Sequence, residues 1–212
     1  MKKIVIINCG GNVLSLVRAI NKYNFNVNIT NDLDKIKNAT HIFLPGVGTF
    51  KNAMKKLKQA NLVNLLQDLD FTKINLMGIC LGMQILMSEG EEDGYCKGLN
   101  LISGKVKKIN LQNSKNKAQK KIPNIGWYKL QTNNKDFKNT IIKNLNLNNK
   151  FYFIHSYFVK LGKDEECIAD IKYGSLNIPA IVKKNKIYGC QFHPEKSREN
   201  GLTLIENFLK LD

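Results

Sequence analysis

Along roughly the first ninety residues, short continuous apolar runs alternate with stretches whose apolar residues recur every three or four positions. The continuous runs are typical of strands buried on both faces, and the spaced pattern is typical of helices that bury one face. Strands and helices that alternate in this way predict a parallel sheet covered by helices on both sides. The expected strands are 2–8, 26–30, 41–46 and 74–80, and the expected helices are 12–24, 51–69 and 81–90.

The second half of the chain is richer in strand-like runs, and short turns separate most of them, so we expect some antiparallel pairs. A final helix is expected over 201–211, and the Lys- and Asn-rich segment 110–121 is expected to be an exposed loop. Neither a linker nor a repeat divides the chain, so we predict one domain over 1–212. The expected strands of this half are 104–109, 127–132, 150–161, 167–173, 178–184 and 186–193.

The chain is strongly basic, with 33 Lys and Arg residues against 17 Asp and Glu residues and a net charge of +16. The lysines are scattered among asparagines, as in 110–121 and 134–150, and no RNA-binding aromatic signature or helix-turn-helix pattern accompanies them. This distribution favours a solvated basic surface, and no nucleic-acid partner is expected. A nucleic-acid binder remains an alternative that charge alone would allow.

The start of the chain has too short an apolar run for a signal peptide, and no run approaches the ~18 residues needed to span a membrane. We therefore expect a cytoplasmic protein with no membrane partner. The cysteines are odd in number and contain no Cys-x-x-Cys pair, and the histidines do not stand at metal-ligand spacing, so neither a disulfide framework, a metal site nor a cofactor is expected. These residues are Cys9, Cys80, Cys96, Cys167, Cys190, His41, His155 and His193.

Cys80 stands where the expected strand 74–80 meets a helix, within the sequence Gly-Ile-Cys-Leu-Gly. This spacing is that of a nucleophile elbow with a thiol in place of a hydroxyl. Gly78 and Gly82 would relieve the crowding of such a tight turn, and the N–H of Leu81 would serve as an oxyanion donor. Taken alone, the same pattern could be a buried cysteine between packing glycines.

The stretch Gln-Phe-His-Pro-Glu-Lys-Ser places His193 and Glu195 two residues apart at the end of the expected strand 186–193. We expect Pro194 to keep this segment extended, so that both side chains leave the same face. If the strand joins the main sheet, the pair lies at the same edge as Cys80. Cys80 would then be the nucleophile, His193 its base and acid, and Glu195 the group that orients the ring.

The stretch Leu-Pro-Gly-Val-Gly-Thr-Phe, 44–50, ends the expected third strand at that same edge. Gly46 and Gly48 allow the main chain to approach a substrate closely. The backbone of Val47 and Gly48 could supply a second oxyanion donor and hold a carboxylate. An ordinary Pro-Gly turn is the alternative for this stretch considered by itself.

With these three stretches in view, the sequence resembles the class I (triad) glutamine amidotransferases and, among them, the glutaminase subunits of imidazole glycerol phosphate synthases. The resemblance covers nearly the whole chain. It implies a three-layer fold with a mostly parallel central sheet, helices on both faces and a smaller antiparallel sheet. The stretches that carry it are 44–50, 78–94, 97–106, 122–130, 151–157 and 191–197.

The resemblance also implies the reaction. Cys80 would attack the side-chain amide of glutamine, ammonia would leave, and water would hydrolyse the thioester while His193 relays protons. The ammonia would pass to a (β/α)₈ barrel synthase subunit, the partner in a heterodimer. That subunit cleaves a ribonucleotide to form imidazole glycerol phosphate in histidine biosynthesis.

Further site residues follow from the same resemblance. Gln84 would hold glutamine, and it lies one helical turn after Cys80. Lys196 would lie at the partner interface, with Ser197 close by. The complete implied set is Gly48, Gln84, Glu92, His155, Ser156 and Tyr157 for the substrate, and Asn12, Trp127 and Lys196 for the partner.

The sequence departs from the family pattern at three places. The family usually begins with an Asp-Tyr-Gly-x-Gly-Asn-Leu type stretch, but here Asn8 and Cys9 stand in it, with one residue fewer before Asn12. Asn124 replaces a usual His, and Tyr128 replaces a usual Asn. These departures leave the expected triad intact. They keep open a paralogous glutaminase that supplies ammonia for amidine formation on bacterial surface sugars.

Two other classes of protein share parts of these motifs. A thiol peptidase would need the cysteine and histidine pair but not the stretch 44–50. A non-catalytic stress protein of similar architecture could carry Cys80 at an elbow but would not need His193 and Glu195.

Overall fold

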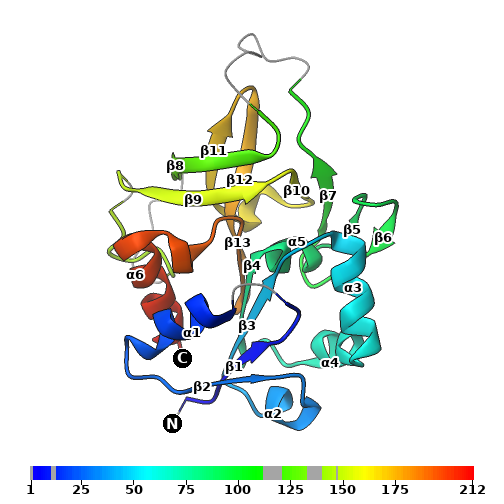
Figure 1. Ribbon diagram of the computed structural model, residues 1–212, viewed down its shortest axis with the longest axis vertical. Helices are drawn as coiled ribbons and strands as arrows, with labels where there is room; N and C mark the ends of the chain where they lie inside the picture. The colour runs from blue at the N-terminus through cyan, green and yellow to red at the C-terminus, as the bar shows by residue number, and fades with distance from the viewer. Residues whose placement is uncertain (1, 11–12, 112–120, 133–139, 147) are drawn as a thin grey trace.

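The computed structural model describes residues 2–10, 13–111, 121–132, 140–146 and 148–212. Strands and helices alternate through the first part of the chain, as the apolar pattern predicts (Figure 1). Its elements are β1 (Ile4–Ile7), α1 (Val13–Asn21), β2 (Val27–Thr30), α2 (Leu33–Lys37), β3 (His41–Gly46), α3 (Phe50–Gln59), α4 (Leu62–Asp68), β4 (Asn75–Cys80) and α5 (Leu81–Ile85).

Strands dominate the remainder of the chain until a final helix. These elements are β5 (Glu89–Gly90), β6 (Cys96–Lys97), β7 (Gly104–Lys108), β8 (Asn124–Lys129), β9 (Lys150–His155), β10 (Tyr157–Leu161), η2 (Asp164–Glu166), β11 (Cys167–Tyr173), β12 (Leu176–Lys184), β13 (Ile187–Cys190), η3 (Pro194–Lys196) and α6 (Arg198–Leu209).

The central sheet has seven strands in the order β11-β12-β13-β4-β3-β1-β2. The five strands from β13 to β2 run parallel to their neighbours, whereas β12 and β11 are antiparallel. The predicted mostly parallel sheet is therefore confirmed. Because β13 pairs in parallel with β4, with Cys190 opposite Ile79, the segment that carries His193 does end at the same edge as Cys80.

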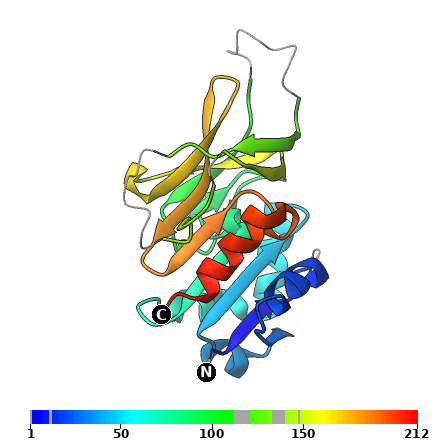
Figure 2. The ribbon, with the colours of Figure 1, turned by 90° about the vertical axis from the view of Figure 1, so that its left-hand side faces the viewer.

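Helices cover both faces of this sheet (Figure 2). Successive residues of β1 point to opposite faces, because side chains alternate along a strand. Ile4 and Ile6 join a buried cluster with α1 and α6. Val5 and Ile7 join a second buried cluster with α2, α3, α4 and α5. The parallel strands are thus buried on both sides, as their continuous apolar sequence requires.

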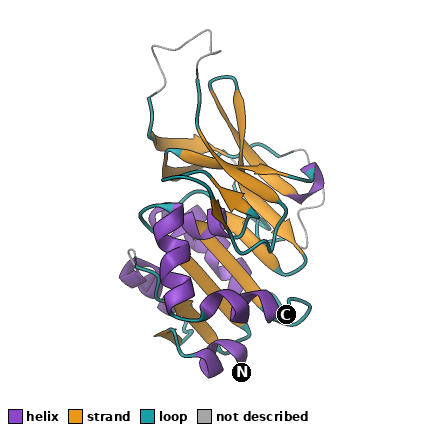
Figure 3. Cartoon of the chain, turned by 90° about the vertical axis from the view of Figure 1, so that its right-hand side faces the viewer, coloured by secondary structure: helices purple, strands orange, loops and turns teal. Residues whose placement is uncertain are grey.

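Two smaller sheets accompany the central one. One has four strands in the order β10-β7-β5-β6, with β5 and β7 parallel, and the other pairs β8 with β9 in antiparallel fashion. The helices gather around one end of the molecule and strands form the other (Figure 3). The single smaller antiparallel sheet that the resemblance implied is therefore replaced by one mixed and one antiparallel sheet.

The single helix expected over 51–69 is wrong, because the chain forms two helices, α3 and α4. Asn61 separates them with a left-handed backbone, at φ 57°. Asparagine adopts this conformation more readily than other residues with a side chain. Apolar spacing on both sides of Asn61 concealed the break.

The helix expected over 81–90 is also too long, because α5 ends at Ile85. The carbonyls of Ile85, Leu86 and Met87 accept hydrogen bonds of 2.8 to 3.0 Å from the N–H groups of residues 99–101. The following loop therefore takes the acceptors that a longer helix would use. Residues 89–90 form β5 instead.

Other boundaries shift by a few residues. The strand expected over 127–132 begins at Asn124, and the run 150–161 breaks at Ser156 into strands of two different sheets. The final helix begins at Arg198, three residues earlier than expected. Of the expected exposed loop 110–121, residues 112–120 lie outside the described part of the chain.

Candidate active site

Cys80 forms a sharp turn between β4 and α5, with φ 55° and ψ −111°. A positive φ at a residue with a side chain is uncommon and marks a strained backbone. A Cβ added at Gly78 would lie 2.7 Å from the carbonyl oxygen of Gly82, which confirms the crowding expected there. A Cβ added at Gly82 would lie 1.7 Å from the carbonyl oxygen of Leu44. Gly82 is thus needed above all for the approach of α5 to β3.

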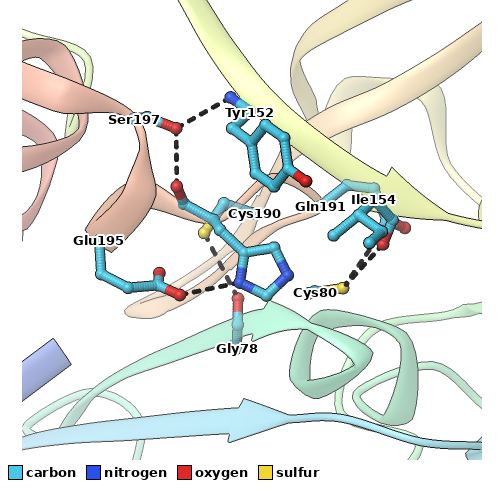
Figure 4. A network of polar contacts seen from close by, with 9 residues as sticks. Gly78, Cys80, Tyr152, Ile154, Cys190, Gln191, Glu195 and Ser197 are labelled. Atoms are coloured by element: carbon cyan, nitrogen blue, oxygen red, sulfur yellow. Dashed lines mark hydrogen bonds and ion pairs between the residues drawn. The ribbon is translucent and has the colours of Figure 1, made fainter. Parts of the chain in front are cut away.

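The thiol of Cys80 is half-buried and has two polar neighbours (Figure 4). It donates to the carbonyl oxygen of Ile154 on β9 at 3.8 Å. The side-chain amide nitrogen of Gln191 donates to the Cys80 sulfur at 3.8 Å. The thiol therefore lies between the central sheet and the β8–β9 sheet.

His193 and Glu195 come together as a hydrogen-bonded pair, with 2.8 Å between His193 Nδ1 and Glu195 Oε1. Their side chains are only 11% and 5% exposed. The expectation that Pro194 keeps this segment extended is wrong, because Pro194–Lys196 forms a 3₁₀ turn. Proline suits the first position of such a turn, and the turn folds the carboxylate back onto the ring.

The surroundings of His193 favour its charged form. Burial acts to lower the pKa of His193, but interactions with Cys80 and with the Glu195 carboxylate outweigh it and raise the pKa to about 10. Since the carboxylate oxygen accepts, Nδ1 carries a hydrogen and Nε2 is left for proton exchange. The second Glu195 oxygen, Oε2, is buried and has no hydrogen-bond partner in the described part of the protein.

The backbone of His193 is held from two sides. Its N–H donates to the carbonyl of Tyr152 at 2.9 Å, and the Ser197 hydroxyl donates to its carbonyl at 2.6 Å. The same hydroxyl accepts from the N–H of Tyr152 at 3.0 Å. Ser197 was expected near the partner interface, but it is only 1% exposed and its hydroxyl joins η3 to β9.

The stretch 44–50 lies beside the elbow, because Gly46 pairs with Cys80 in the register of β3 and β4. Val47 and Gly48 follow directly and are exposed, and Gly48 has φ 96°. Leu81 begins α5 immediately after the thiol. Both backbone segments predicted to form the oxyanion hole thus flank Cys80.

Gln84 is buried in α5, and its amide nitrogen donates to the carbonyl of Tyr157 at 2.9 Å and to Gln191 Oε1 at 3.0 Å. It therefore joins α5 to β10 and to the segment before His193. The sequence assigned no role to Gln191, which is fully buried. Its signal was a polar residue in an otherwise apolar run, since a buried polar side chain must find partners.

Glu92 contacts the other end of the stretch 44–50. One carboxylate oxygen accepts from the N–H of Phe50, the first residue of α3, at 2.7 Å. Burial raises the pKa of Glu92, whereas this hydrogen bond acts in the opposite direction. Glu92 thus connects the turn after β5 to the loop after β3.

His155 is buried and neutral at physiological pH, since burial lowers its pKa to about 4. Its Nδ1 lies 2.8 Å from the carbonyl of Tyr157, so it carries the hydrogen. Its Nε2 accepts from the amide of Asn124 at 3.0 Å. The backbone carbonyl of Ser156 accepts from Ile109 at 2.9 Å, which attaches this segment to the end of β7.

The sequence is similar to those of known amidotransferases. The family described as "Glutamine amidotransferase class-I" matches residues 5–211. The imidazole glycerol phosphate synthase subunit HisH 1 of Legionella pneumophila strain Paris is 37% identical, and the alignment covers 100% of both chains. Subunit HisH of Lactococcus lactis is 42% identical over 99% of both chains. The chain belongs to the class I glutamine amidotransferases, in the HisH family.

The fold of this class I amidotransferase agrees with that assignment. A crystal structure of a glutamine amidotransferase, 15% identical in sequence, superposes with a TM-score of 0.70 and covers 98% of this chain and 97% of the other. At that identity the likeness concerns the fold alone. The class I fold that the sequence motifs implied is therefore confirmed.

Two of the residues predicted for the partner interface lie on the surface of the amidotransferase. Trp127 on β8 is 38% exposed, and the Arg198 guanidinium lies 5.1 Å from its ring centre. Lys196 is exposed in η3 nearby. Trp127 and Arg198 line a hollow of about 520 Å³, together with Asn148, Asn149, Lys150, Ser197, Glu199 and Asn200. Asn12 lies outside the described residues.

The departures from the family pattern fall in three different surroundings. The backbone of Asn8 is held by Asn31, through hydrogen bonds of 2.9 and 3.1 Å. Tyr128 packs edge-on against Phe153, with 5.7 Å between ring centres. Asn124 is fully buried, and its Oδ1 has no hydrogen-bond partner in the described part of the molecule.

Within the ranges that the structure describes, no group of three or more His, Cys, Asp or Glu side chains could hold a metal ion. None of the described helices is long and apolar enough to cross a membrane.

Proposed function

We propose that this chain is the glutaminase subunit of an imidazole glycerol phosphate synthase and hydrolyses glutamine to glutamate and ammonia. One observation carries the proposal: the hydrogen-bonded pair of His193 and Glu195 ends the strand next to the one that ends at the elbow cysteine Cys80. The full-length likeness to HisH subunits supports it.

In the proposed mechanism, His193 Nε2 takes the proton of the Cys80 thiol while Glu195 holds the opposite side of the ring. The thiolate attacks the amide carbon of glutamine, and the N–H groups of Leu81 and Val47 stabilise the oxyanion. His193 then gives its proton to the leaving nitrogen, which departs as ammonia and leaves a thioester. A water molecule, deprotonated by His193, attacks the thioester and releases glutamate.

The substrate would be held by Gly48, Gln84, Glu92 and the segment 155–157. The contacts that support this are those that join these residues across elements: Gln84 with the carbonyl of Tyr157, and Glu92 with the loop after β3. Together they bring α5, β10 and the turn after β5 toward the thiol.

A diazo-keto analogue of glutamine tests this site. It should alkylate one cysteine, Cys80, and glutamine should protect that cysteine. Cys9 and Cys190 are buried and serve as internal controls in peptide-resolved mass spectrometry. Labelling spread over several cysteines would contradict an activated thiolate at the elbow.

The partner in this proposal is a barrel-type synthase subunit that receives the ammonia, with Trp127 and Lys196 on the docking side. We expect the isolated chain to hydrolyse glutamine slowly and the partner with its acceptor substrate to accelerate it, through the loop that contains Val47 and Gly48. The net charge of +16 favours an acidic docking face, so binding should weaken with salt. A cytoplasmic location remains a prediction.

The acceptor is tested by growth without histidine, in a strain that lacks any other copy of this subunit and carries the chain with its own barrel partner. Growth supports the histidine pathway. Failure to grow, with glutaminase activity intact, would favour the paralogous role in amidine formation on surface sugars. The structural observation that keeps this second candidate is the buried Asn124, whose Oδ1 has no hydrogen-bond partner among the described residues.

A further inference from the structure

Gln191 lies two residues before His193 and is fully buried. Its backbone N–H donates to the carbonyl of Ala180 on β12 at 2.9 Å, which fixes the position of its Cα. Its side chain extends between Gln84 and Cys80. Packing alone does not account for a buried amide that contacts both a predicted substrate residue and the nucleophile.

The orientation of this amide follows from a single backbone carbonyl. The carbonyl of Tyr157 can only accept, so the end of Gln84 that faces it at 2.9 Å must be the NH₂ group. The same NH₂ group faces Gln191, so the atom opposite it at 3.0 Å must be the Gln191 oxygen. The Gln191 NH₂ group then necessarily points to the Cys80 sulfur, at 3.8 Å.

This donor stabilises one protonation state of the sulfur much more than the other, because a neutral thiol is only a weak acceptor. A neutral thiol has its own hydrogen to donate, and the Ile154 carbonyl accepts it at 3.8 Å. A thiolate has no hydrogen, so the same carbonyl repels it, while an N–H donor stabilises it. Removal of the proton by His193 therefore abolishes the hydrogen bond to Ile154 and strengthens the one from Gln191.

We infer that Gln191 is a positioning residue that fixes the amide of Gln84 in one orientation and donates a hydrogen bond to the Cys80 thiolate. It thereby joins the residue predicted to bind glutamine to the nucleophile through one side chain. The part that concerns glutamine rests on the function proposed above, whereas the part that concerns the thiolate does not.

Two variants separate these contacts. Gln191→Met has nearly the same length and removes both the donor and the acceptor. Gln191→Glu retains an oxygen toward Gln84 but places a second oxygen against the sulfur. Asn75→Leu is a matched control, because Asn75 is a buried amide (2% exposed) at the opposite end of β4 from Cys80.

Alkylation of Cys80 by iodoacetamide, followed peptide by peptide across the pH range, measures the thiolate directly. Gln191→Met should slow alkylation at pH 7 severalfold and move its half-maximal rate to higher pH, because the thiolate loses its hydrogen-bond donor. Gln191→Glu should move the half-maximal rate to a still higher pH, because its carboxylate would lie against the Cys80 thiolate. Asn75→Leu should lower the melting temperature and leave the pH profile unchanged.

Glutamine kinetics test the second contact. Gln191→Met should raise KM and lower kcat, whereas Gln191→Glu should lower kcat with a smaller rise in KM, because it still accepts from Gln84. A Gln191→Met protein with the wild-type alkylation profile would overturn the inference, even if it melts earlier. If it does not fold, an unchanged profile in Gln191→Glu would overturn it equally.

The two proposals can fail separately. Alkylation requires no glutamine, so its dependence on Gln191 is decided even if the wild-type chain proves not to hydrolyse glutamine. If the wild-type enzyme hydrolyses glutamine but the alkylation of Cys80 does not depend on Gln191, only the positioning role of Gln191 is rejected.

Discussion

The two turns that meet at the candidate active site end neighbouring strands of one sheet, but they are built in different ways. The turn at Cys80 is held by steric fit between backbones: a Cβ at Gly78 or Gly82 would collide with a carbonyl group. The turn at His193 is held by hydrogen bonds to Tyr152 and Ser197. The first depends on the absence of side chains, and the second on specific side-chain and backbone partners.

This difference predicts different responses to mutation. A steric turn has no intermediate state, because an added methyl group either fits or forces the backbone apart. A turn held by several hydrogen bonds can lose one of them and keep its shape, at a cost of about 1–3 kcal/mol for each group left unpaired. Substitutions in the two turns therefore test whether steric fit or hydrogen bonding holds each of them.

The largest effect should come from Cys80→Ala. It removes the proposed nucleophile without adding atoms to the turn, so glutamine hydrolysis should fall by at least about 10⁴-fold while the fold is kept. The measurement is glutamate release, with circular dichroism to check the fold.

The other four cysteines, Cys9, Cys96, Cys167 and Cys190, provide the control, because each should be replaceable by serine or alanine with activity largely retained. Near-normal hydrolysis by Cys80→Ala would contradict the proposed mechanism.

The next effect distinguishes His193 from Glu195. His193→Ala removes the proton carrier and should lower kcat by about 10⁴-fold, whereas Glu195→Ala removes only the group that orients it. Glu195→Ala should therefore retain about a hundredfold more activity than His193→Ala. Steady-state kinetics of the two variants give the comparison. Equal and mild losses would show that the pair is structural.

Gly82→Ala should be the most destabilising single methyl group in the steric turn. The added Cβ would lie 1.7 Å from the Leu44 carbonyl oxygen, so we expect a loss of more than about 4 kcal/mol or failure to fold. Gly94→Ala is the control: Gly94 has φ 93° but open surroundings, so it should cost only about 1–2 kcal/mol. Similar losses in urea unfolding would mean that backbone conformation, not collision, makes Gly82 necessary.

The difference between the two turns also explains why one could be predicted from the sequence and the other could not. The elbow could be predicted from five residues, because the spacing of Gly78, Cys80 and Gly82 is enough to indicate a tight turn. Parallel pairing of β13 with β4 was likewise accessible, because a continuous apolar run in an α/β chain is most easily placed in the central sheet.

The rest depended on contacts between distant parts of the chain. The extended form predicted around Pro194 was wrong because the turn is set by Tyr152, forty-one positions before His193, and by α6, which packs on the Pro194 carbonyl through Gly201. Gln191 was overlooked for the same reason: its partners are 107 and 111 positions away. No local pattern specifies such pairs.

Ser197→Ala tests whether the hydrogen-bonded turn tolerates the loss of one partner. The substitution leaves the N–H of Tyr152 and the carbonyl of His193 without the hydroxyl that joins them. We expect a loss of about 1–3 kcal/mol in stability and about a tenfold lower kcat, since His193 would be less well placed. Thr203→Ala is the control, because the Thr203 hydroxyl bonds only the carbonyl of Glu199 within α6 among the contacts described, and it should change stability by less than about 0.5 kcal/mol.

The smallest effect concerns the charge of His193. The chain has three histidines, and burial lowers the pKa of His41 and of His155 to about 4, so His193 alone should titrate above pH 7 in an NMR experiment. Glu195→Gln keeps the shape of the side chain but removes its charge. It should therefore lower the pKa of His193 from about 10, because one of the two groups that raise it has become neutral.

The same substitution should change stability in a way that depends on pH. A group whose folded-state pKa is raised contributes stability that is complete below its unfolded pKa, near 6.5 for histidine, and is lost as pH rises through the folded value. The wild-type protein should thus exceed Glu195→Gln in unfolding free energy most at pH 6 to 7, and the difference should shrink toward pH 10. A difference that stays constant from pH 6 to 10 would mean that Glu195 acts on His193 only as a hydrogen-bond partner, and that the charge of Glu195 does not stabilise the second turn.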